Sequence, residues 1–307
     1  MKAIVYWDRR GHDLAPLTDH LAVCLHPIAG RALIALALDL LADLRIRDVA
    51  IASWTRDDSV AAALGNGAPW GMELRQLQLN YHTNEVDVWL EGTQDDVLVV
   101  RGDALISPVL EAFIARTGDL SGSFIHGLLD GHPVLALARP WADGSWHFPV
   151  EPFGGRDRPS PVARSVTLDG DASLMESLAA YHAAHLRVVR GQFAGRKPFG
   201  REQDHAVVGA RARIAASVQA RGSAHVGAGS ALREGVVLDG SVAIGERSVI
   251  DADTTISDSV ILPDTYVGRH LRLRNAIVAG NILIRVDTGA VLRLEDDFIL
   301  APLRPKS

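Results

Sequence analysis

The stretch ALREGVVLDGSVAIGERSVIDADTTI, residues 231–256, carries a large aliphatic side chain at every sixth position. The spacing continues on both sides, and only Ala220 is smaller than a large aliphatic. The aliphatic column is Val208, Ile214, Ala220, Val226, Leu232, Leu238, Ile244, Ile250, Ile256 and Leu262. A second column lies four residues after each of the first nine positions: Ala212, Val218, Ala224, Ser230, Val236, Val242, Ser248, Thr254 and Val260. Its members are all small or β-branched, and the two columns together predict a repeating fold.

A period of six indicates a triangular coil in which each side is a short strand with one aliphatic side chain inside and one small residue near the corner. Three such sides complete a turn, and the coils stack by parallel strand pairing about 4.8 Å apart. We predict a left-handed parallel β-helix of about four coils over residues 206–285, in a domain that spans 206–307. One residue is missing from the period after Leu262, because the next aliphatic is Val267. Residues 291–300 are expected to add a last strand.

The chain before residue 194 alternates apolar strands with helices. Strands are predicted at residues 2–7, 48–53 and 97–103, and helices at residues 31–44, 107–116 and 171–193. Ser107 is the expected cap of the second of these helices. The pattern predicts a doubly wound α/β domain over residues 1–193, joined by a linker at 194–205. Ligands of such sheets bind at the carboxyl ends of the strands, so the loops after residues 6 and 101 form the candidate site.

Composition excludes several classes of protein. A formal net charge of -6 and an aromatic content of 6% do not suit a nucleic-acid partner. Cys24 is the single cysteine, which favours a reducing, cytoplasmic compartment. The most apolar stretch, residues 32–44, is too short to span a bilayer and contains Asp39 and Asp43, so we do not expect a membrane-embedded protein.

The first loop and helix of the chain are DRRGHDLAPLTDHLAVCLHPIAGRALI, residues 8–34. Together with the later Gly102-Asp103 pair and the hexapeptide repeats, they resemble the nucleotide-sugar pyrophosphorylases. These are sugar-1-phosphate nucleotidylyltransferases with a C-terminal left-handed β-helix, and their first loop is approximately GGxGTRLxPLT, followed by PKPxxPxxGxPLI. The matching positions here are Gly11, Leu14, Pro16, Leu17, Thr18, Pro27, Gly30, Leu33 and Ile34. The resemblance implies that the nucleotide is bound by Gly11, Pro16, Thr18 and Gly102.

The chain departs from the family at its charged positions. The loop arginine is replaced by Asp13 and the lysine by Val23, while Arg9 and Arg10 are the neighbouring cations that could substitute for them. Nucleotidyl transfer depends on cancelling phosphate charge. One charge pair at about 4 Å is worth about 4 kcal/mol at an effective dielectric near 20, so the loss of one cation could slow the step by on the order of a thousandfold.

The resemblance also implies an Mg²⁺ ion held by Asp103 and Asp169 if the protein is an active enzyme, and no cofactor otherwise. The alternative for Asp103 is that it only starts the turn before the next helix. Asp171 is the alternative second carboxylate, but the preferred interpretation is that it caps the helix at 171–193. The G-T-A segment that reads the base and the E-K-P segment near the sugar have no counterpart in residues 80–89 and 136–146.

Other side chains admit two interpretations. His182 and His185 have a spacing that can bind a metal, but a solvated helix face is the preferred interpretation. Trp141 and Trp146 flank a predicted hairpin, where packing is preferred over the stacking of a sugar. Hexapeptide helices also occur in acyltransferases, for which His225 and His270 would be the available histidines.

The sequence therefore predicts a pyrophosphorylase-like protein of bacterial exopolysaccharide biosynthesis. We expect a pseudoenzyme with impaired catalysis and a regulatory or scaffolding role. The first alternative is an active nucleotidylyltransferase, and the second is a hexapeptide acyltransferase. Expected partners are a nucleotide sugar or sugar phosphate, a second copy of the chain in a dimer, and a polysaccharide-assembly sugar transferase. The last follows from the similarity of residues 181–193 and 257–268 to family members associated with such transferases.

Overall fold

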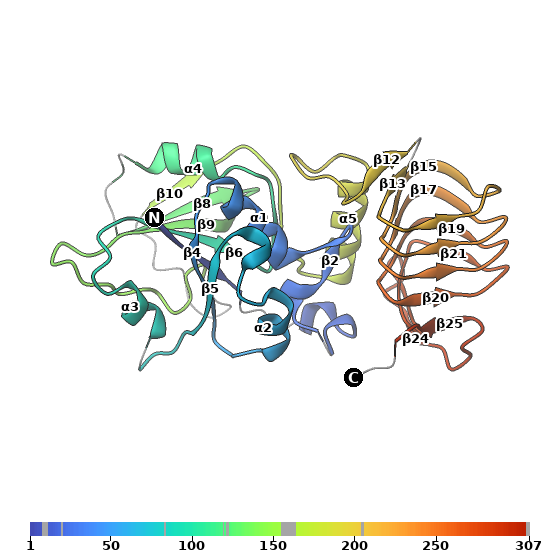
Figure 1. The fold of residues 1–307 in the computed structure, drawn as a ribbon, viewed down its shortest axis with the longest axis horizontal. Helices are drawn as coiled ribbons and strands as arrows, with labels where there is room; N and C mark the ends of the chain where they lie inside the picture. The colour runs from blue at the N-terminus through green and yellow to red at the C-terminus, as the bar shows by residue number, and fades with distance from the viewer. Residues whose placement is uncertain are drawn as a thin grey trace. The chain divides into compact units, whose positions relative to one another are not determined.

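The computed structural model describes residues 1–7, 12–19, 21–82, 84–118, 120, 123–154, 164–203 and 206–304. Contacts between residues divide the chain into two units. The first consists of residues 1–12, 18–26 and 32–174, and the second of residues 13–17, 27–31 and 175–307. Figure 1 shows an open sheet with helices in the first unit and a stack of coils in the second. The division differs from the predicted boundary at residue 193, because the helix that follows residue 177 belongs to the second unit.

A mixed sheet forms the centre of the first unit. In spatial order its strands are β10 (Arg164–Thr167), β8 (Phe124–Leu129), β9 (His132–Ala138), β6 (Val97–Arg101), β1 (Lys2–Tyr6), β4 (Asp48–Ser53) and β5 (Glu73–Gln78). The four strands from β6 to β5 run parallel, and β9 is antiparallel to both of its neighbours. A separate short pair is formed by β7 (Leu105–Ile106) and β11 (Ala172–Ser173).

Both faces of the sheet are covered, which explains the unbroken apolar sequence of the parallel strands. The helices are α1 (Leu33–Asp43), α2 (Asp58–Leu64), α3 (Glu85–Leu90) and α4 (Leu110–Thr117). Side chains of α1, α2 and α4 share one core with Val5 and Val100, while α3 and the chain around Phe148 share the other with Ile4 and Val99. Short 3-10 helices are formed by η1 (His12–Leu14), η2 (Leu17–Asp19), η3 (Val23–Leu25) and η4 (Ala68–Trp70).

The second unit is a parallel β-helix with helix α5 (Leu178–Val189) packed on it. One of its sheets contains β12 (Arg201–Gln203), β13 (Ala206–Val208), β15 (Gln219–Val226), β17 (Val237–Ile244), β19 (Thr255–Ile261), β21 (Arg272–Arg274), β22 (Ala276–Ala279), β23 (Ile282–Arg285) and β24 (Val291–Arg293). The other contains β14 (Arg213–Ile214), β16 (Ala231–Leu232), β18 (Val249–Ile250), β20 (Thr265–Val267) and β25 (Leu300–Pro302). A further pair is β2 (Pro27–Ile28) with β3 (Arg31–Ala32).

The stacking register confirms the predicted coil of three hexads. Gln219 pairs with Val237, eighteen residues later, and the same offset joins Val226 to Ile244. The predicted aliphatic column consequently separates into three ladders. These are Val208, Val226, Ile244, Ile261 and Val278; Ile214, Leu232, Ile250, Val267 and Leu300; and Ala220, Leu238, Ile256 and Leu273.

The position of the missing residue was predicted wrongly. Asp239 pairs with Ser257 at the offset of eighteen, whereas Ile244 pairs with Ile261 at an offset of seventeen. The residue is therefore lost at the corner around Asp258, which has a positive φ of 42°, and not after Leu262. Leu262 consequently lies outside the interior ladder, in which Ile261 takes its place.

Hydroxyl groups of the second column bond successive coils together at the corners. The Ser230 hydroxyl donates to Gly245 O at 2.8 Å and accepts from Ser248 N at 3.1 Å. The Thr254 hydroxyl donates to Gly268 O at 2.7 Å and accepts from Leu271 N at 3.0 Å. Backbone groups that the turns leave unpaired are thereby satisfied in the interior, which explains why small hydroxyl residues recur there.

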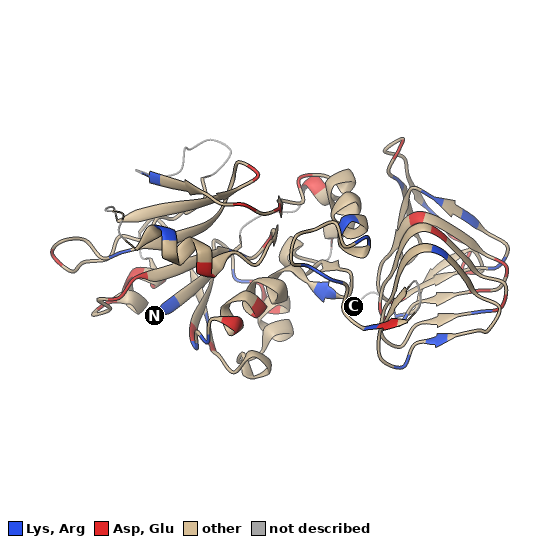
Figure 2. Ribbon diagram, turned by 90° about the horizontal axis from the view of Figure 1, so that it is seen from above, with Lys and Arg blue, Asp and Glu red and all other residues tan. Residues whose placement is uncertain are grey.

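The surface of the β-helix carries charges of both signs. Figure 2 shows Lys and Arg interspersed with Asp and Glu along the coils. Arg247 bonds Asp264 of the next coil at 2.7 Å, and Arg285 bonds Asp287 at 2.6 Å. Such mixing does not produce the wide basic field that a nucleic-acid partner requires. None of the helices in the described part of the chain has the length and apolar character needed to cross a membrane.

Two positions of one ladder test whether interior stacking stabilises the β-helix. Ile250 is fully buried, whereas Ile214, in the first coil of the same ladder, is 40% exposed. We expect Ile250→Ala to lower the free energy of unfolding by about 2–5 kcal/mol and Ile214→Ala by less than about 1.5 kcal/mol. Urea unfolding followed by circular dichroism would measure both, and equal losses would contradict the ladder interpretation.

Candidate functional site

The carboxyl edge of the parallel strands is the candidate site. The strands β1, β4, β5 and β6 end there in adjacent register, with Tyr6 opposite Arg101 and Ser53 opposite Gln78. Gly102 follows β6, and its N–H donates to Tyr6 O at 2.7 Å. A Cβ atom at Gly102 would lie 2.6 Å from a methyl group of Val5, so this close approach requires glycine.

Asp103 lies beneath this edge and is fully buried. One carboxylate oxygen, Oδ1, accepts a hydrogen bond from Arg101 Nε at 2.8 Å. The other, Oδ2, is buried without a hydrogen-bond partner among the described residues. A buried carboxylate oxygen without a partner is costly unless a donor or cation approaches it. Asp103 therefore fits the role of one metal ligand.

The second predicted metal ligand is Asp169. Asp169 is exposed in a bend, and the described residues contain no group of three or more His, Cys, Asp or Glu that could hold a metal ion. Mg²⁺ is often held by one or two carboxylates together with substrate phosphates, so Asp103 could supply one ligand and a substrate the rest. The predicted assignment of Asp103 and Asp169 to Mg²⁺ remains a prediction.

Asp171 does not cap a helix, contrary to the prediction. Its N–H donates to the Ser107 hydroxyl at 2.9 Å, and its carbonyl accepts from Ser107 N at 3.0 Å. Helix α5 begins later, at Leu178, and the Ser177 hydroxyl caps it by accepting from Ala180 N at 3.0 Å. Ser107 likewise bonds the β7–β11 region instead of capping α4. A short antiparallel pair at β11 therefore replaces the first turns of the predicted helix.

The structure describes only part of the predicted nucleotide-binding loop. Arg9, Arg10 and Gly11 lie outside the described residues. Pro16 belongs to the second unit, whereas Thr18 and Gly102 belong to the first. Asp13 is exposed in η1.

Val23, which stands where the family has lysine, is a buried core residue in η3. Its neighbour Cys24 is also buried. Burial, and then the negative charge of Asp103, raise the pKa of the Cys24 thiol well above its ordinary value. A neutral thiol beside a carboxylate supplies no charge for a phosphate.

Arg101 is a candidate site residue that the sequence analysis did not single out. Its side chain is 13% exposed, and its guanidinium carbon lies 5.8 Å from the centre of the Phe153 ring. Its position directly before Gly102-Asp103, at the end of a strand, is the feature of the sequence that could have identified it.

An aromatic pair occupies the same edge. The rings of Trp54, after β4, and Tyr81, after β5, meet edge to face with centroids 4.8 Å apart. Tyr81 is 55% exposed. Tyr81 lies in the region where the base-reading segment of the family was sought, and it offers a π-face on which a base can stack.

The PIAG segment, residues 27–30, belongs to the second unit and is bonded to other parts of it. Pro27 O accepts from the Tyr181 hydroxyl at 2.7 Å, and Ala29 N donates to His185 Nδ1 at 3.3 Å. Gly30 has a φ of 92°, and a Cβ atom there would lie 3.1 Å from His225 Cε1. This strand–turn–strand segment is therefore fixed by α5 and the β-helix.

The predicted solvated face of His182 and His185 is consequently wrong, because both residues are buried. His182 Nε2 donates to Asp258 O at 2.8 Å. His225, a histidine considered for acyl transfer, is 1% exposed and bonds Phe199 O through Nε2 at 3.2 Å. His270 is exposed and lies 3.7 Å from Asp253. These positions favour packing roles for the three buried histidines.

Comparison with known proteins agrees with the β-helix. Residues 209–297 match the family described as GlmU-like, C-terminal hexapeptide, which confirms the predicted hexapeptide region. None of the curated proteins matches the chain. Among solved structures, the chain is similar to a protein from Bacillus anthracis described as a glucose-1-phosphate thymidylyltransferase in complex with a sucrose. The identity is 15%, the TM-score is 0.44, and the match covers 60% of this chain and 94% of that chain. The α/β sheet and the stacked coils confirm the predicted fold class.

The buried histidine under the PIAG segment predicts a pH dependence of stability. Burial lowers the pKa of His225 to about 4, below the roughly 6.5 of an exposed imidazole. The unfolded chain therefore binds this proton first as the pH falls from 6.5 to 4, and stability is lost across that window. We expect the loss in the free energy of unfolding between pH 7.0 and 4.5 to be about 2 kcal/mol smaller in His225→Gln than in the unchanged protein.

Urea unfolding at pH 7.0, 5.5 and 4.5 would measure this difference. Glutamine can still donate a hydrogen bond to Phe199 O but does not titrate. His270→Gln, at a histidine that is 68% exposed, is the matched control for the replacement of a histidine by glutamine. The same acid sensitivity in all three proteins would show that His225 is not the cause.

Proposed function

We propose that this protein is a sugar-1-phosphate nucleotidyltransferase-like protein of bacterial polysaccharide biosynthesis whose catalytic activity is largely lost. In this proposal it is a cytoplasmic pseudoenzyme that binds a nucleotide sugar or sugar phosphate and has a regulatory or scaffolding role. The observation that carries the proposal is the charge balance at the carboxyl edge. Arg101 is bonded to the buried Asp103, and the position of the family lysine is the buried Val23.

The described residues of this edge supply little compensation for a triphosphate. The Arg101–Asp103 pair has one positive and one negative charge, and the Nε–Oδ1 distance of 2.8 Å joins them closely. A phosphate that approaches Arg101 would also approach the Asp103 carboxylate. Nucleotidyl transfer requires net positive charge where negative charge develops on the phosphates in the transition state. The residues of this edge therefore support nucleotide binding better than they support catalysis.

Binding surfaces nevertheless remain. The Trp54–Tyr81 pair offers a platform for a base, and the β-helix offers open strand edges for association. The edge strand β24 exposes Val291 and Leu292, at 48% and 52%. An edge with exposed apolar residues supports self-association as a dimer.

The partner part of the proposal rests on two segments that the fold brings together. Residues 181–193 and 257–268 contact each other through His182 and Asp258, and Arg190 bonds the Asp258 carboxylate at 3.2 Å. The exposed portions of the same segments remain the proposed contact for a polysaccharide-assembly sugar transferase.

An active nucleotidylyltransferase is the second candidate, and the partnerless Oδ2 of Asp103 favours it. In that case Asp103 would be a ligand of Mg²⁺, with Asp169 as the proposed second ligand. Arg9 or Arg10 would provide the cation that the family has elsewhere in the loop.

Pyrophosphate release separates the two candidates. We expect the full chain, incubated with Mg²⁺, each nucleoside triphosphate and a panel of sugar 1-phosphates, to release no more pyrophosphate than the Asp103→Asn variant. The reason is a loss on the order of a thousandfold for each missing transition-state cation. Release by the unchanged protein that disappears in Asp103→Asn would establish the active enzyme instead.

Nucleotide binding tests the retained part of the site. We expect Tyr81→Ala to weaken the binding of a nucleoside diphosphate sugar about tenfold, since stacking of a base on an aromatic ring contributes roughly 1–3 kcal/mol. Tyr81→Phe keeps the ring and should bind normally. Calorimetric titration with the uridine, thymidine, guanosine and adenosine diphosphate sugars would measure the affinities. Equal affinity in Tyr81→Ala would remove Tyr81 from the site, and no binding to the unchanged protein would leave scaffolding as the function.

A further inference from the structure

A cavity of about 140 Å³ lies at the other end of the first unit's sheet. Ala138, in its wall, pairs with Val97, the first residue of β6, and with Phe124. The carboxyl-edge site begins after Arg101, at the last residue of the same strand. Four residue steps along a strand span roughly 13 Å, so the cavity is separate from the candidate nucleotide site.

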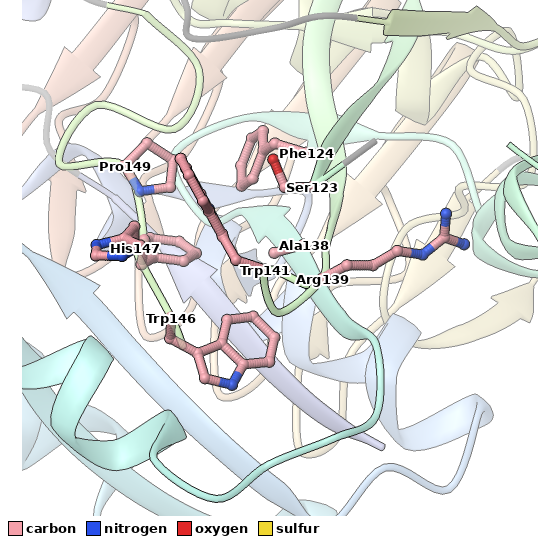
Figure 3. A pocket seen from close by; sticks show the side chains of 9 residues that line it. Ser123, Phe124, Ala138, Arg139, Trp141, Trp146, His147 and Pro149 are labelled. Carbon is pink, nitrogen blue, oxygen red and sulfur yellow. The ribbon is translucent and has the colours of Figure 1, made fainter. Parts of the chain in front are cut away.

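The wall of the cavity is aromatic. It contains Phe124, Trp141, Phe148 and Pro149, and Figure 3 shows the indole of Trp141 among them. Trp141 is 54% exposed, whereas the other tryptophan of this turn, Trp146, is 7% exposed and donates from Nε1 to Thr93 O at 2.9 Å. Packing therefore accounts for Trp146. Packing does not account for Trp141 in the same way, because about half of this residue is exposed to solvent.

A tight turn holds Trp141 in this position. Trp141 N donates to Ser145 O and Gly144 N donates to Trp141 O, both at 2.8 Å. The carboxylate of Asp143 accepts from Ser145 N at 2.9 Å and from its hydroxyl at 2.6 Å. The ring of His147 meets the indole edge to face at 5.0 Å. The exposed indole is thus fixed before any ligand arrives, which lowers the entropic cost of binding.

The charges around the cavity favour a neutral ligand. Arg139 is the lining residue, among those described, with a permanent charge, and its Nε lies 3.0 Å from Asp96. Its Nη2 donates to Thr117 O at 3.1 Å, and its Nη1 donates to Leu120 O. Figure 3 shows the guanidinium extended away from Trp141. Each of its three nitrogens is bonded within the protein, and the Asp96 carboxylate pairs with its charge, so it is a poor binding group for a phosphate or carboxylate.

Polar groups that can bond hydroxyls remain in the wall. Ser123 supplies a hydroxyl, and His147 supplies an imidazole whose Nε2 lies 3.3 Å from the Ser145 hydroxyl. An aromatic face beside a few polar donors and acceptors is complementary to a sugar ring. The ring's C–H groups are weakly positive and suit the negative π-face, while its hydroxyls bond the polar side chains. Pockets for drug-sized ligands have volumes of roughly 300–1,000 Å³, so this smaller cavity suits a single ring.

We propose that this cavity is a binding subsite for one uncharged sugar residue, such as a unit of a saccharide chain, which stacks on Trp141. The subsite is independent of the nucleotide site at the carboxyl edge.

Saturation-transfer NMR on the full chain would test the proposal with D-glucose, D-galactose, D-mannose and N-acetyl-D-glucosamine. We expect at least one of the four to bind with a Kd in the millimolar range, as is typical of an affinity of about 4 kcal/mol. Trp141→Ala should weaken this binding at least tenfold, and Trp141→Phe, which keeps an aromatic face, should weaken it less. Tyr81→Ala, at the exposed aromatic of the other edge, should leave it unchanged.

Three outcomes would overturn the proposal. The first is that none of the four sugars binds at 50 mM, on the order of ten times the expected Kd. The second is binding that persists in Trp141→Ala, because the sugar then lies elsewhere. The third is Trp141-dependent binding of cyclohexanol or glucose 1-phosphate that is tighter than that of every neutral sugar, which would identify an apolar or an anionic pocket. Loss of nucleotide binding in Tyr81→Ala with normal sugar binding would keep this subsite distinct from the proposed nucleotide site.

Discussion

Parallel pairing at an offset of eighteen residues is the constraint on which the second unit depends. It places Val226 against Ile244 and Leu232 against Ile250 in successive coils. A single coil of three short strands cannot bury its own aliphatic side chains, so each becomes apolar core only when a neighbour covers it. Insertions of one residue would move a whole ladder to the other face of its strand. Corner positions are constrained for the same reason, and their hydroxyls join one coil to the next.

The interruption of this register between β17 and β19 lies beside α5. At Asp258 the corner is one residue shorter, and the aspartate takes a positive φ of 42°. Its carbonyl accepts from His182 and its carboxylate from Ser241 N and Arg190. The shortened corner thus presents a carbonyl and a carboxylate to the helix, while the interior ladder continues with Ile261. The same helix holds the PIAG segment through Tyr181 and His185, so register, helix and segment form one connected set of contacts within the second unit.

The sequence predicted the periodic parts of this protein well and the contact-dependent parts poorly. The ladders and the parallel strands could be predicted because each depends on spacing along one strand. The break at Asp258 could not, since Ile261 and Leu262 are both aliphatic and only pairing with Ile244 separates them. His182 and His185 were assigned to a solvated face for a similar reason. Their helix packs on a surface that is distant in the sequence, and helical spacing alone does not show which face is covered.

At the candidate site, the same distinction separates the glycines that set the backbone conformation from the charged residues that would act on a phosphate. The resemblance located Gly102 and Asp103, and the close approach to Val5 explains why glycine is kept whether or not catalysis survives. Gly30 has a comparable structural reason, because its positive φ and its contact with His225 both exclude a side chain. Retention of such positions is therefore weak evidence of activity. Charge is the stronger criterion: a cation that acts on phosphate must not be neutralised by a carboxylate of its own site. Arg101 bonds Asp103 at 2.8 Å. The described residues of the carboxyl edge therefore offer a phosphate little net positive charge. In the proposed function, that balance favours a site that holds the neutral parts of a nucleotide sugar, its base and its sugar, over one that activates its phosphates.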